Sequence, residues 1–343
     1  MRQFKYILFL IVSLPFLTFC SNDNYNENLL KPKSSKDLGE ILIVLEKKYW
    51  SSEIYDKLKT NFSKLITTTP LPYEKEFNLD LVSPNGLNKT IKKSNAIIII
   101  DVSDKNNYIE YVKPTYDLWS KNQIVFNIKA NTITNIVNYL EAFSTTIKQD
   151  LNKFYYKRIR SEYSYDSEVN KTLLSKHKIK LAFPSGVVIK KSFENFTWLN
   201  KLEIKKKDGK NHEIQKGFFI YSVPYTNKNI FSKNMQIYIR DSLLKKYVLG
   251  EKDSNYMITR KDELAKICST SLLYNSEYIF EINGLWRVVD DRMGGPFVSI
   301  SLYDEINNRV IIIEGYVYAP NFTKSDLIRE VKAVLYSYIL TQK

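Results

Sequence analysis

The sequence predicts an α+β fold made of two layered α/β units, the second an antiparallel sheet with flanking helices. In the first unit, apolar runs of strand length alternate with segments whose apolar residues recur at helical spacing. In the second unit, three strand-like segments follow one another between two helical segments. The chain has 343 residues, 44% of them hydrophobic and 14% aromatic, which is enough apolar material for two such cores.

The first unit, residues 39–162, opens with a continuous apolar run at 41–45 that predicts a buried strand. Ser51 or Ser52 is placed to cap a following helix. Further strands are expected at 77–82, 96–100 and 123–129. A long helix over 134–160, with one apolar face, ends the unit.

A linker over 163–175 is expected before the second unit, residues 176–343. Ser232 is placed to cap one helix of this unit, and Thr323 with Asp326 resembles a capping box for the last helix. Strands are expected at 179–183, 196–202, 217–223, 278–289, 297–303 and 310–318. Turn residues between the last two strands predict an antiparallel hairpin.

The amino-terminal segment has the pattern of a bacterial lipoprotein signal. Residues 1–19 combine two basic residues with a short apolar stretch, and Cys20 stands where the polar chain begins. The apolar stretch is shorter than the roughly 20 residues that a membrane-spanning helix requires. We therefore expect lipid on Cys20 to provide a membrane anchor, with residues 20–38 as a flexible tether. Phe19 is larger than the usual residue before such a cysteine, so an ordinary signal peptide is the alternative.

Composition excludes several classes of site. The chain has two cysteines and two histidines, so a zinc site is not expected, and if Cys20 is acylated, Cys268 has no disulfide partner. The formal net charge of +14 is spread along the chain rather than gathered in one block, which disfavours a nucleic-acid partner. The flanking residues predict that His177 and His212 are exposed and that Cys268 is buried. No cofactor is expected.

The segment 287–297 is the candidate ligand site. It is expected to join two strands and to display polar groups beside glycines, which would let a ligand anion approach the backbone. The alternative is a turn whose glycines take positive φ and whose Asp and Arg residues pair locally. Two tyrosines that alternate along a later strand share a face and complete the candidate set. This set is Arg287, Asp290, Asp291, Arg292, Gly294, Gly295, Tyr316 and Tyr318.

Catalytic motifs are not evident in the sequence. Gly294-Gly295-Pro296 lacks the lysine and serine of a nucleotide-binding loop, and the proline removes an amide donor. Adjacent carboxylates at 290 and 291 would point to opposite faces of a strand, unlike the pair in a glycosidase. The residues therefore favour a non-enzymatic binding or structural module, with an envelope protein as a possible partner class. The competing hypothesis is a hydrolase or small-anion binder using 287–297.

Several stretches of the chain resemble an uncharacterised family of bacteroidete envelope lipoproteins, domain of unknown function 4837. These stretches are 39–44, 95–101, 183–186, Trp198, 284–297 and 315–320. The resemblance implies a lipoprotein that faces the periplasm from the outer membrane, and it implies no known activity. The second unit also resembles the α/β/α sandwiches of photosystem-associated and nuclear-transport-factor-binding proteins, which bears on fold alone.

Overall fold

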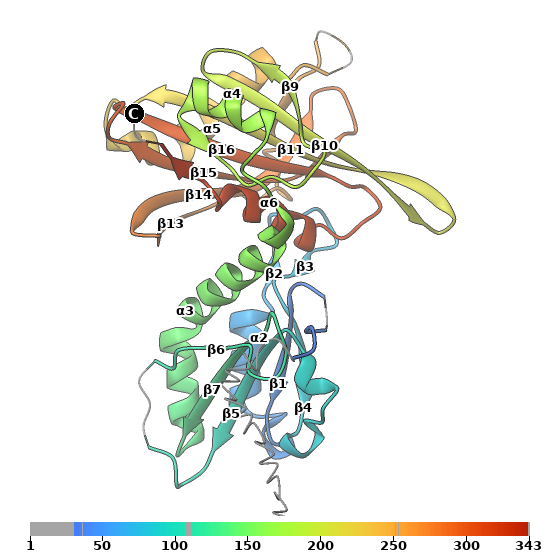
Figure 1. Ribbon diagram of the computed structural model, residues 1–343, viewed down its shortest axis with the longest axis vertical. Coiled ribbons are helices and arrows are strands. Elements are labelled where there is room, and N and C mark those ends of the chain that lie inside the picture. The colour runs from blue at the N-terminus through green and yellow to red at the C-terminus, as the bar shows by residue number, and fades with distance from the viewer. Residues whose placement is uncertain (1–30, 36, 108–110, 251, 253, 342–343) are drawn as a thin grey trace, which may run out of the picture.

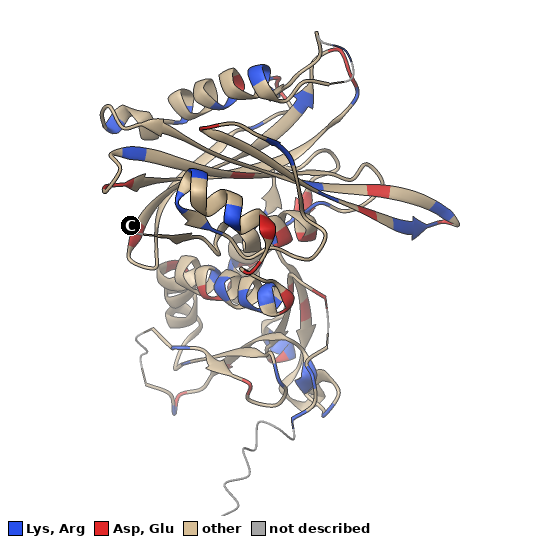
Figure 2. Cartoon of the chain, turned by 45° about the horizontal axis from the view of Figure 1, so that its top comes forward, with Lys and Arg blue, Asp and Glu red and all other residues tan. Residues whose placement is uncertain are grey.

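The computed structural model describes residues 31–35, 37–107, 111–250, 252 and 254–341. The expected signal segment, Cys20 and most of the tether lie outside the described residues. Figure 1 shows two units, one above the other, joined by the long helix α3. The fold is α+β, as the sequence predicts, and Lys and Arg positions are distributed over both units (Figure 2).

The first unit is built on a five-stranded sheet in the order β4-β1-β5-β7-β6. All neighbouring strands are parallel except β6 and β7. The strands are β1 (Glu40–Val44), β4 (Asn78–Val82), β5 (Ala96–Val102), β6 (Thr115–Tyr116) and β7 (Ile124–Ala130). A separate two-stranded ribbon, β2 (Leu65–Ile66) with β3 (Glu74–Lys75), extends from the same unit.

Helices α2 (Glu53–Phe62) and α3 (Ile133–Ile159) pack on one face of this sheet. Their apolar residues lie among Ile41, Ile43 and other strand side chains that point to that face. The opposite face holds a smaller cluster around Leu42 and Val44, as the two-residue period of a strand requires. The side chain of Thr132 accepts a hydrogen bond from the Asn135 N–H at the start of α3.

The second unit is an eight-stranded antiparallel sheet in the order β12-β14-β15-β16-β11-β10-β9, with β13 also paired to β14. The strands are β9 (Val188–Ser192), β10 (Phe196–Lys207), β11 (Lys210–Pro224), β12 (Met257–Thr259), β13 (Cys268–Tyr274), β14 (Glu277–Val288), β15 (Gly294–Asp304) and β16 (Arg309–Tyr318). Short strands β8 (Ile179–Lys180) and β17 (Ile339–Leu340) pair beside it. Its β10–β11 hairpin projects from the body (Figure 1).

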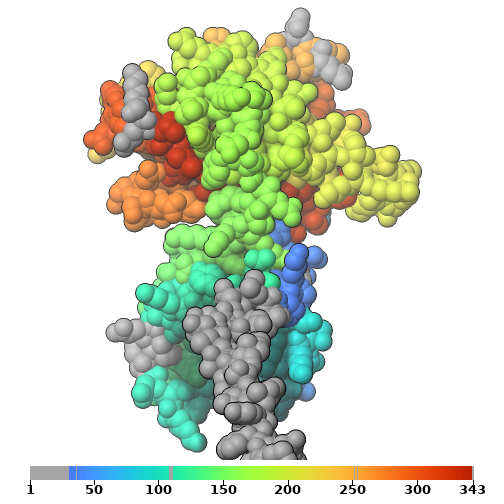
Figure 3. All heavy atoms as spheres, viewed as in Figure 1, coloured from blue at the N-terminus to red at the C-terminus, as the bar shows by residue number. Residues whose placement is uncertain are grey.

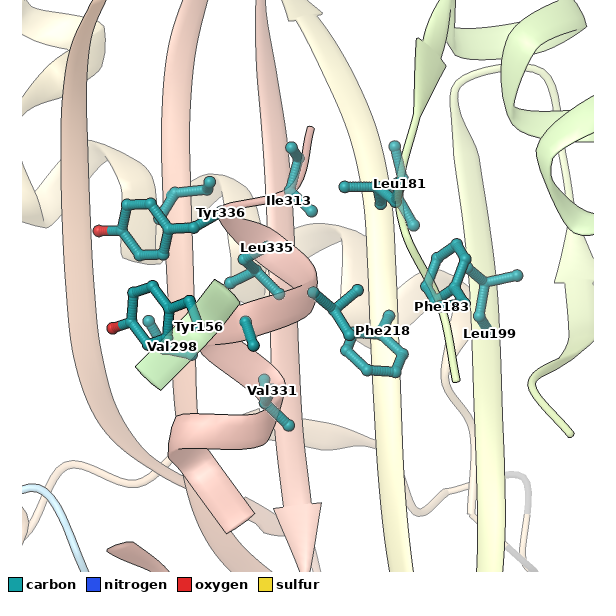
Figure 4. Packing of buried hydrophobic residues seen from close by; sticks show 14 of the residues in the cluster. Tyr156, Leu181, Phe183, Leu199, Phe218, Val298, Ile313, Val331, Leu335 and Tyr336 are labelled. Atoms are coloured by element: carbon teal, nitrogen blue, oxygen red, sulfur yellow. The ribbon is translucent and has the colours of Figure 1, made fainter. Parts of the chain in front are cut away.

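Both faces of this sheet are covered. On β11, Phe218 and Ile220 enter the core beneath α4 (Glu168–His177) and α6 (Ser325–Leu335), whereas Phe219 and Tyr221 enter the core beneath α5 (Lys233–Tyr247). Figure 4 shows the first of these cores, where side chains of α6 lie against the sheet. Short 3₁₀ helices occupy Lys47–Tyr49, Pro84–Gly86, Ile91–Lys93, Arg160–Glu162 and Lys228–Phe231.

Helix α3 contributes side chains to both units. Its buried apolar residues between Ile136 and Tyr155 lie in the core of the first unit, whereas Tyr156 lies in the core of the second. The Tyr156 and Tyr336 rings stack with their centroids 5.4 Å apart (Figure 4). One continuous helix therefore packs in both hydrophobic cores.

Two expectations about helices are wrong. Much of the expected linker is helix α4, which the Ser167 side chain caps by accepting from the Asn170 N–H. Val169 and Leu173, four residues apart, bury its inner face. Helix α6 has no side-chain cap from Thr323, because its first N–H groups bond to Glu74 of the first unit instead.

Candidate functional site

The segment 287–297 is mostly strand. β14 continues to Val288 and β15 begins at Gly294, so that Arg287 is paired with Gly294 and Trp286 with Gly295. The expectation that its glycines take positive φ is wrong, since the positive φ in this segment belongs to Asp290. Glycine at 295 instead permits close packing, because a Cβ there would lie 2.0 Å from the Val317 carbonyl oxygen.

The charged side chains of this turn point to solvent. Arg287, Asp290, Asp291 and Arg292 are all exposed. The Asp291 carboxylate accepts from the Met293 N–H at 2.9 Å. Among the described residues, neither aspartate forms an ion pair with either arginine, so the expected local salt bridges are wrong. The turn is closed by backbone and Asx hydrogen bonds.

The tyrosine pair lies apart from these charges. Tyr316 is buried among aromatic rings and its hydroxyl accepts from Trp198 Nε1 at 3.1 Å. Its ring covers Gly217, where a Cβ would lie 2.1 Å from the ring carbons. Tyr318, on the same face, is half-buried beside Trp286. The described residues therefore do not bring the turn's charges and both tyrosines together around one ligand position.

Two single-residue expectations are also wrong. His177 is fully buried because α4 places it in line with Val169 and Leu173, and its Nε2 lies 2.8 Å from the Thr197 hydroxyl. Burial, with nearby Arg309 and Lys176, lowers the pKa of His177 to about 4. Cys268 is exposed, because it lies on β13, at an edge of the sheet.

The candidate site that the structure does form is a cavity of about 290 Å³ between the two units, which we call the junction cavity. Figure 3 shows a narrower waist between the two units, and the residues that line the cavity come from both of them. Its walls come from the β2 region, α3, the β13–β15 part of the large sheet and α6: Lys64, Leu65, Ile66, Thr67, Thr68, Thr69, Glu76, Asn152, Tyr156, Cys268, Asn283, Pro296, Phe297, Ser325, Ile328, Arg329 and Lys332. A smaller hollow of about 100 Å³ adjoins it and shares Asn152, Tyr156 and Lys332.

Hydrogen bonds across the unit boundary hold the walls of the junction cavity in place. The Glu74 carboxylate accepts from the Lys324 and Ser325 N–H groups, which fixes the start of α6. Arg329 Nη2 donates to the Glu76 carbonyl oxygen at 2.8 Å. The Arg329 guanidinium carbon also lies 5.4 Å from the centroid of the Phe77 ring. Both faces of the cavity are thus positioned by contacts that do not need a ligand.

A buried carboxylate lies behind the cavity wall. Glu281 accepts from Lys332 Nζ at 2.8 Å, from Asn283 Nδ2 at 2.7 Å and from the Tyr336 hydroxyl at 2.6 Å. Burial alone would raise the pKa of Glu281, but Lys332 and the hydrogen bonds outweigh burial and the net pKa is lowered. The carboxylate therefore stays charged and fixes the orientation of the Lys332 and Asn283 side chains that line the cavity.

The cavity combines polar and apolar walls. Hydroxyl and amide groups of Thr67, Asn152 and Asn283 stand with apolar surface from Ile328 and Phe297. Three of the charged side chains that line it form ion pairs: Lys332 with Glu281, Glu76 with Lys148, and Arg329 with Asp326. Among the described residues, no group of three His, Cys, Asp or Glu side chains is placed to hold a metal ion. Such walls suit a small amphipathic molecule.

Residues 166–337 match a family model described as a domain of unknown function (DUF4837). The chain belongs to the DUF4837 family. A second model, also described as a domain of unknown function (DUF8532), matches residues 34–164 of this DUF4837 member. Among curated proteins, none matches the chain. No helix within the described residues is long and apolar enough to cross a membrane.

Solved structures with partial likeness to the DUF4837 member include a Ran-binding protein, Mog1p of Saccharomyces cerevisiae. It is 8% identical with a TM-score of 0.29, over 48% of this chain and 90% of that one. A Mog1 mutant is 8% identical with a TM-score of 0.28, over 48% and 92%. The human StarD13 lipid transfer and protein localization domain is 11% identical with a TM-score of 0.22, over 50% and 98%. Likenesses at these TM-scores carry no inference about this chain.

Proposed function

We propose that the protein is a binding module that holds a small amphipathic ligand in the junction cavity and is anchored to an envelope membrane through lipid on Cys20. The cavity carries the first part of this proposal, because it is a preformed space between two units with hydroxyl and amide groups beside apolar walls. The pattern at residues 1–24 supports the second part. An outer-membrane position facing the periplasm belongs to the same proposal.

The alternative, a hydrolase or anion binder at 287–297, has less support. The charged side chains of the turn are exposed, and Tyr316 is occupied by contacts with Trp198 and Phe219. Of this segment, Pro296 and Phe297 line the junction cavity. The segment therefore contributes an apolar wall to the proposed site.

The ligand site is tested by native mass spectrometry of the full chain purified from its own membranes. Thr67→Trp should fill the cavity with a bulky ring and remove a bound small molecule that the wild type retains. Thr145→Trp, at an exposed position of α3, is the matched control and should retain it. Absence of a bound molecule from the wild type, or equal retention by both variants, would contradict the proposal.

The anchor is tested separately by fractionating membranes that contain the chain with Cys20 intact or as Cys20→Ala. An acyl mass on Cys20 that the variant lacks, with release of the variant from the membrane, is expected. An unmodified chain cleaved at another position would contradict the anchor and leave the cavity proposal untouched.

A further inference from the structure

A second cavity, of about 700 Å³, lies at the carboxyl-terminal end of α3 and is lined by basic side chains. Lys153, Lys157, Arg158 and Arg160 contribute four cationic groups, whereas Asp117 contributes the one carboxylate among the lining residues. We call this space the basic cavity. It differs from the junction cavity both in its walls and in its excess of positive charge.

Among the described residues, the four cations of the basic cavity have no carboxylate partners, and Lys153 Nζ lies 5.8 Å from the centroid of the Tyr274 ring. Throughout the described chain, ion pairs are common and include buried ones such as Arg240 with Glu314, yet none involves these four side chains. Nη1 of Arg158 is buried and has no hydrogen-bond partner within the part of the chain that the structure describes. A buried guanidinium nitrogen without an acceptor is costly, and an anion in the cavity would supply the acceptor.

The remaining walls restrict the kind of anion. Tyr116, Phe154, Tyr163 and Tyr165 add aromatic surface, and Arg160 Nη1 is already engaged by the Tyr336 carbonyl oxygen at 2.9 Å. The volume exceeds that needed for a bare inorganic ion, and aromatic walls favour an organic portion. Arginine and lysine side chains together suit a phosphate group, because they offer several charge-assisted donors.

We propose that the basic cavity binds a phosphate ester, with the phosphate beside Arg158, Lys153 and Lys157 and the organic portion against the tyrosine rings. The ester could come from a phospholipid headgroup or from a soluble metabolite, and the chemistry of recognition is the same. Lys31 Nζ donates to the Asp117 carbonyl oxygen at 2.7 Å, so the described start of the chain reaches a residue of this cavity.

The length of chain between Cys20 and Lys31 favours a phospholipid headgroup as the source of the phosphate ester. Cys20 stands eleven residues before Lys31, and an extended chain of this length spans at most about 40 Å. A lipid on Cys20 would therefore keep the basic cavity close to phospholipid headgroups. This argument rests on the proposed anchor, whereas the phosphate site itself rests on the cavity, on the buried Arg158 Nη1 and on cations that lack carboxylate partners among the described residues.

The site is tested with the full chain by calorimetric titration with glycerol 3-phosphate and by flotation with phosphatidylcholine vesicles that contain or lack phosphatidylglycerol. Lys153→Ala with Lys157→Ala should weaken binding about tenfold or more, since each charge-assisted bond contributes substantially. Lys205→Ala with Lys206→Ala removes the same charge from the exposed β10–β11 tip and should leave binding within about twofold. Arg158→Gln should weaken binding, and Arg158→Lys should restore part of it.

The titration and the flotation together distinguish a soluble phosphate ester from a phospholipid headgroup. Binding of glycerol 3-phosphate without a phosphatidylglycerol-dependent gain in flotation assigns a soluble ester, and a phosphatidylglycerol-dependent gain that the Lys153/Lys157 variant loses assigns a headgroup. If both double-lysine variants lost binding affinity equally, binding would depend on net charge alone, and the proposed site would be overturned. No binding to either probe would also overturn it. Because both lysines of the first variant are exposed, its folding should match that of the control, as thermal unfolding would check.

Discussion

The Glu74 carboxylate accepts a hydrogen bond of 2.7 Å from the backbone N–H of Ser325, although the two residues lie in different units. Ser325 is the first residue of α6, where N–H groups have no intrahelical acceptor. A carboxylate at this position also interacts favourably with the helix dipole. The β2–β3 ribbon of the first unit thus supplies the cap that the local sequence, Thr323 with Asp326, was expected to supply.

Replacement of Glu74 by alanine should lower the free energy of unfolding by about 1–2 kcal/mol, the usual contribution of a helix cap. Lys75→Ala changes the neighbouring exposed residue and should have little effect. Urea unfolding of both variants followed by circular dichroism measures the difference. Equal stabilities of the two variants would show that α6 does not depend on Glu74.

The Arg240–Glu314 pair should be strongly coupled. Both side chains are almost fully buried, Arg240 Nε lies 2.9 Å from Glu314 Oε2, and the guanidinium carbon lies 3.9 Å from the Phe297 ring centroid. Burial raises the pKa of Glu314, and the charge of Arg240 opposes that rise. Glu314→Leu leaves the buried Arg240 without its main partner and should cost about 3–5 kcal/mol.

Adding Arg240→Met to Glu314→Leu should recover much of that loss, because the double variant buries no unpaired charge. The two single variants and the double variant form a cycle that urea unfolding can measure. Additive losses would contradict the coupling and would mean that the two side chains contribute independently.

His177 should make stability depend on pH. Its folded pKa of about 4 lies below the ordinary value of 6.5, so between these values the unfolded chain binds a proton that the folded chain does not. This contribution to stability is complete above about pH 6.5 and is lost as pH falls toward 4. Relative to His177→Gln, the wild type should lose about 2 kcal/mol between pH 6.5 and 5. Parallel stability profiles of the two chains would contradict this.

The sequence predicted best the elements with strong periodicity. The strands β14, β15 and β16 and the helix α3 stand close to their expected positions because long apolar or alternating runs specify them. Helix α4 was missed because its ten residues hold few apolar side chains among polar ones. The lysines beside His177 predict exposure, whereas its place on α4, four residues after Leu173, explains its burial.

The junction cavity could not be found from the sequence because its walls come from segments more than 250 residues apart, from Lys64 to Lys332. The three threonines at 67–69 line the cavity, but the residues that face them across it depend on how α6 packs against the first unit. The basic cavity likewise combines the end of α3 with Asp117 from the β6–β7 connection. Sequence proximity reveals turns such as the one between Val288 and Gly294, and tertiary packing determines which side chains share a cavity.

Because α3 packs in both hydrophobic cores, the second unit cannot be separated from the first without losing part of its own core. The two family models meet at residue 165, yet Tyr156, which belongs to the first match, fills part of the core of the second. A gene fragment cut at that boundary would carry the large sheet away without one of its own packing side chains. Fusing the second unit to another protein would therefore require a replacement for the last turns of α3. The boundary between the two family matches is thus not a point at which the units can be exchanged independently.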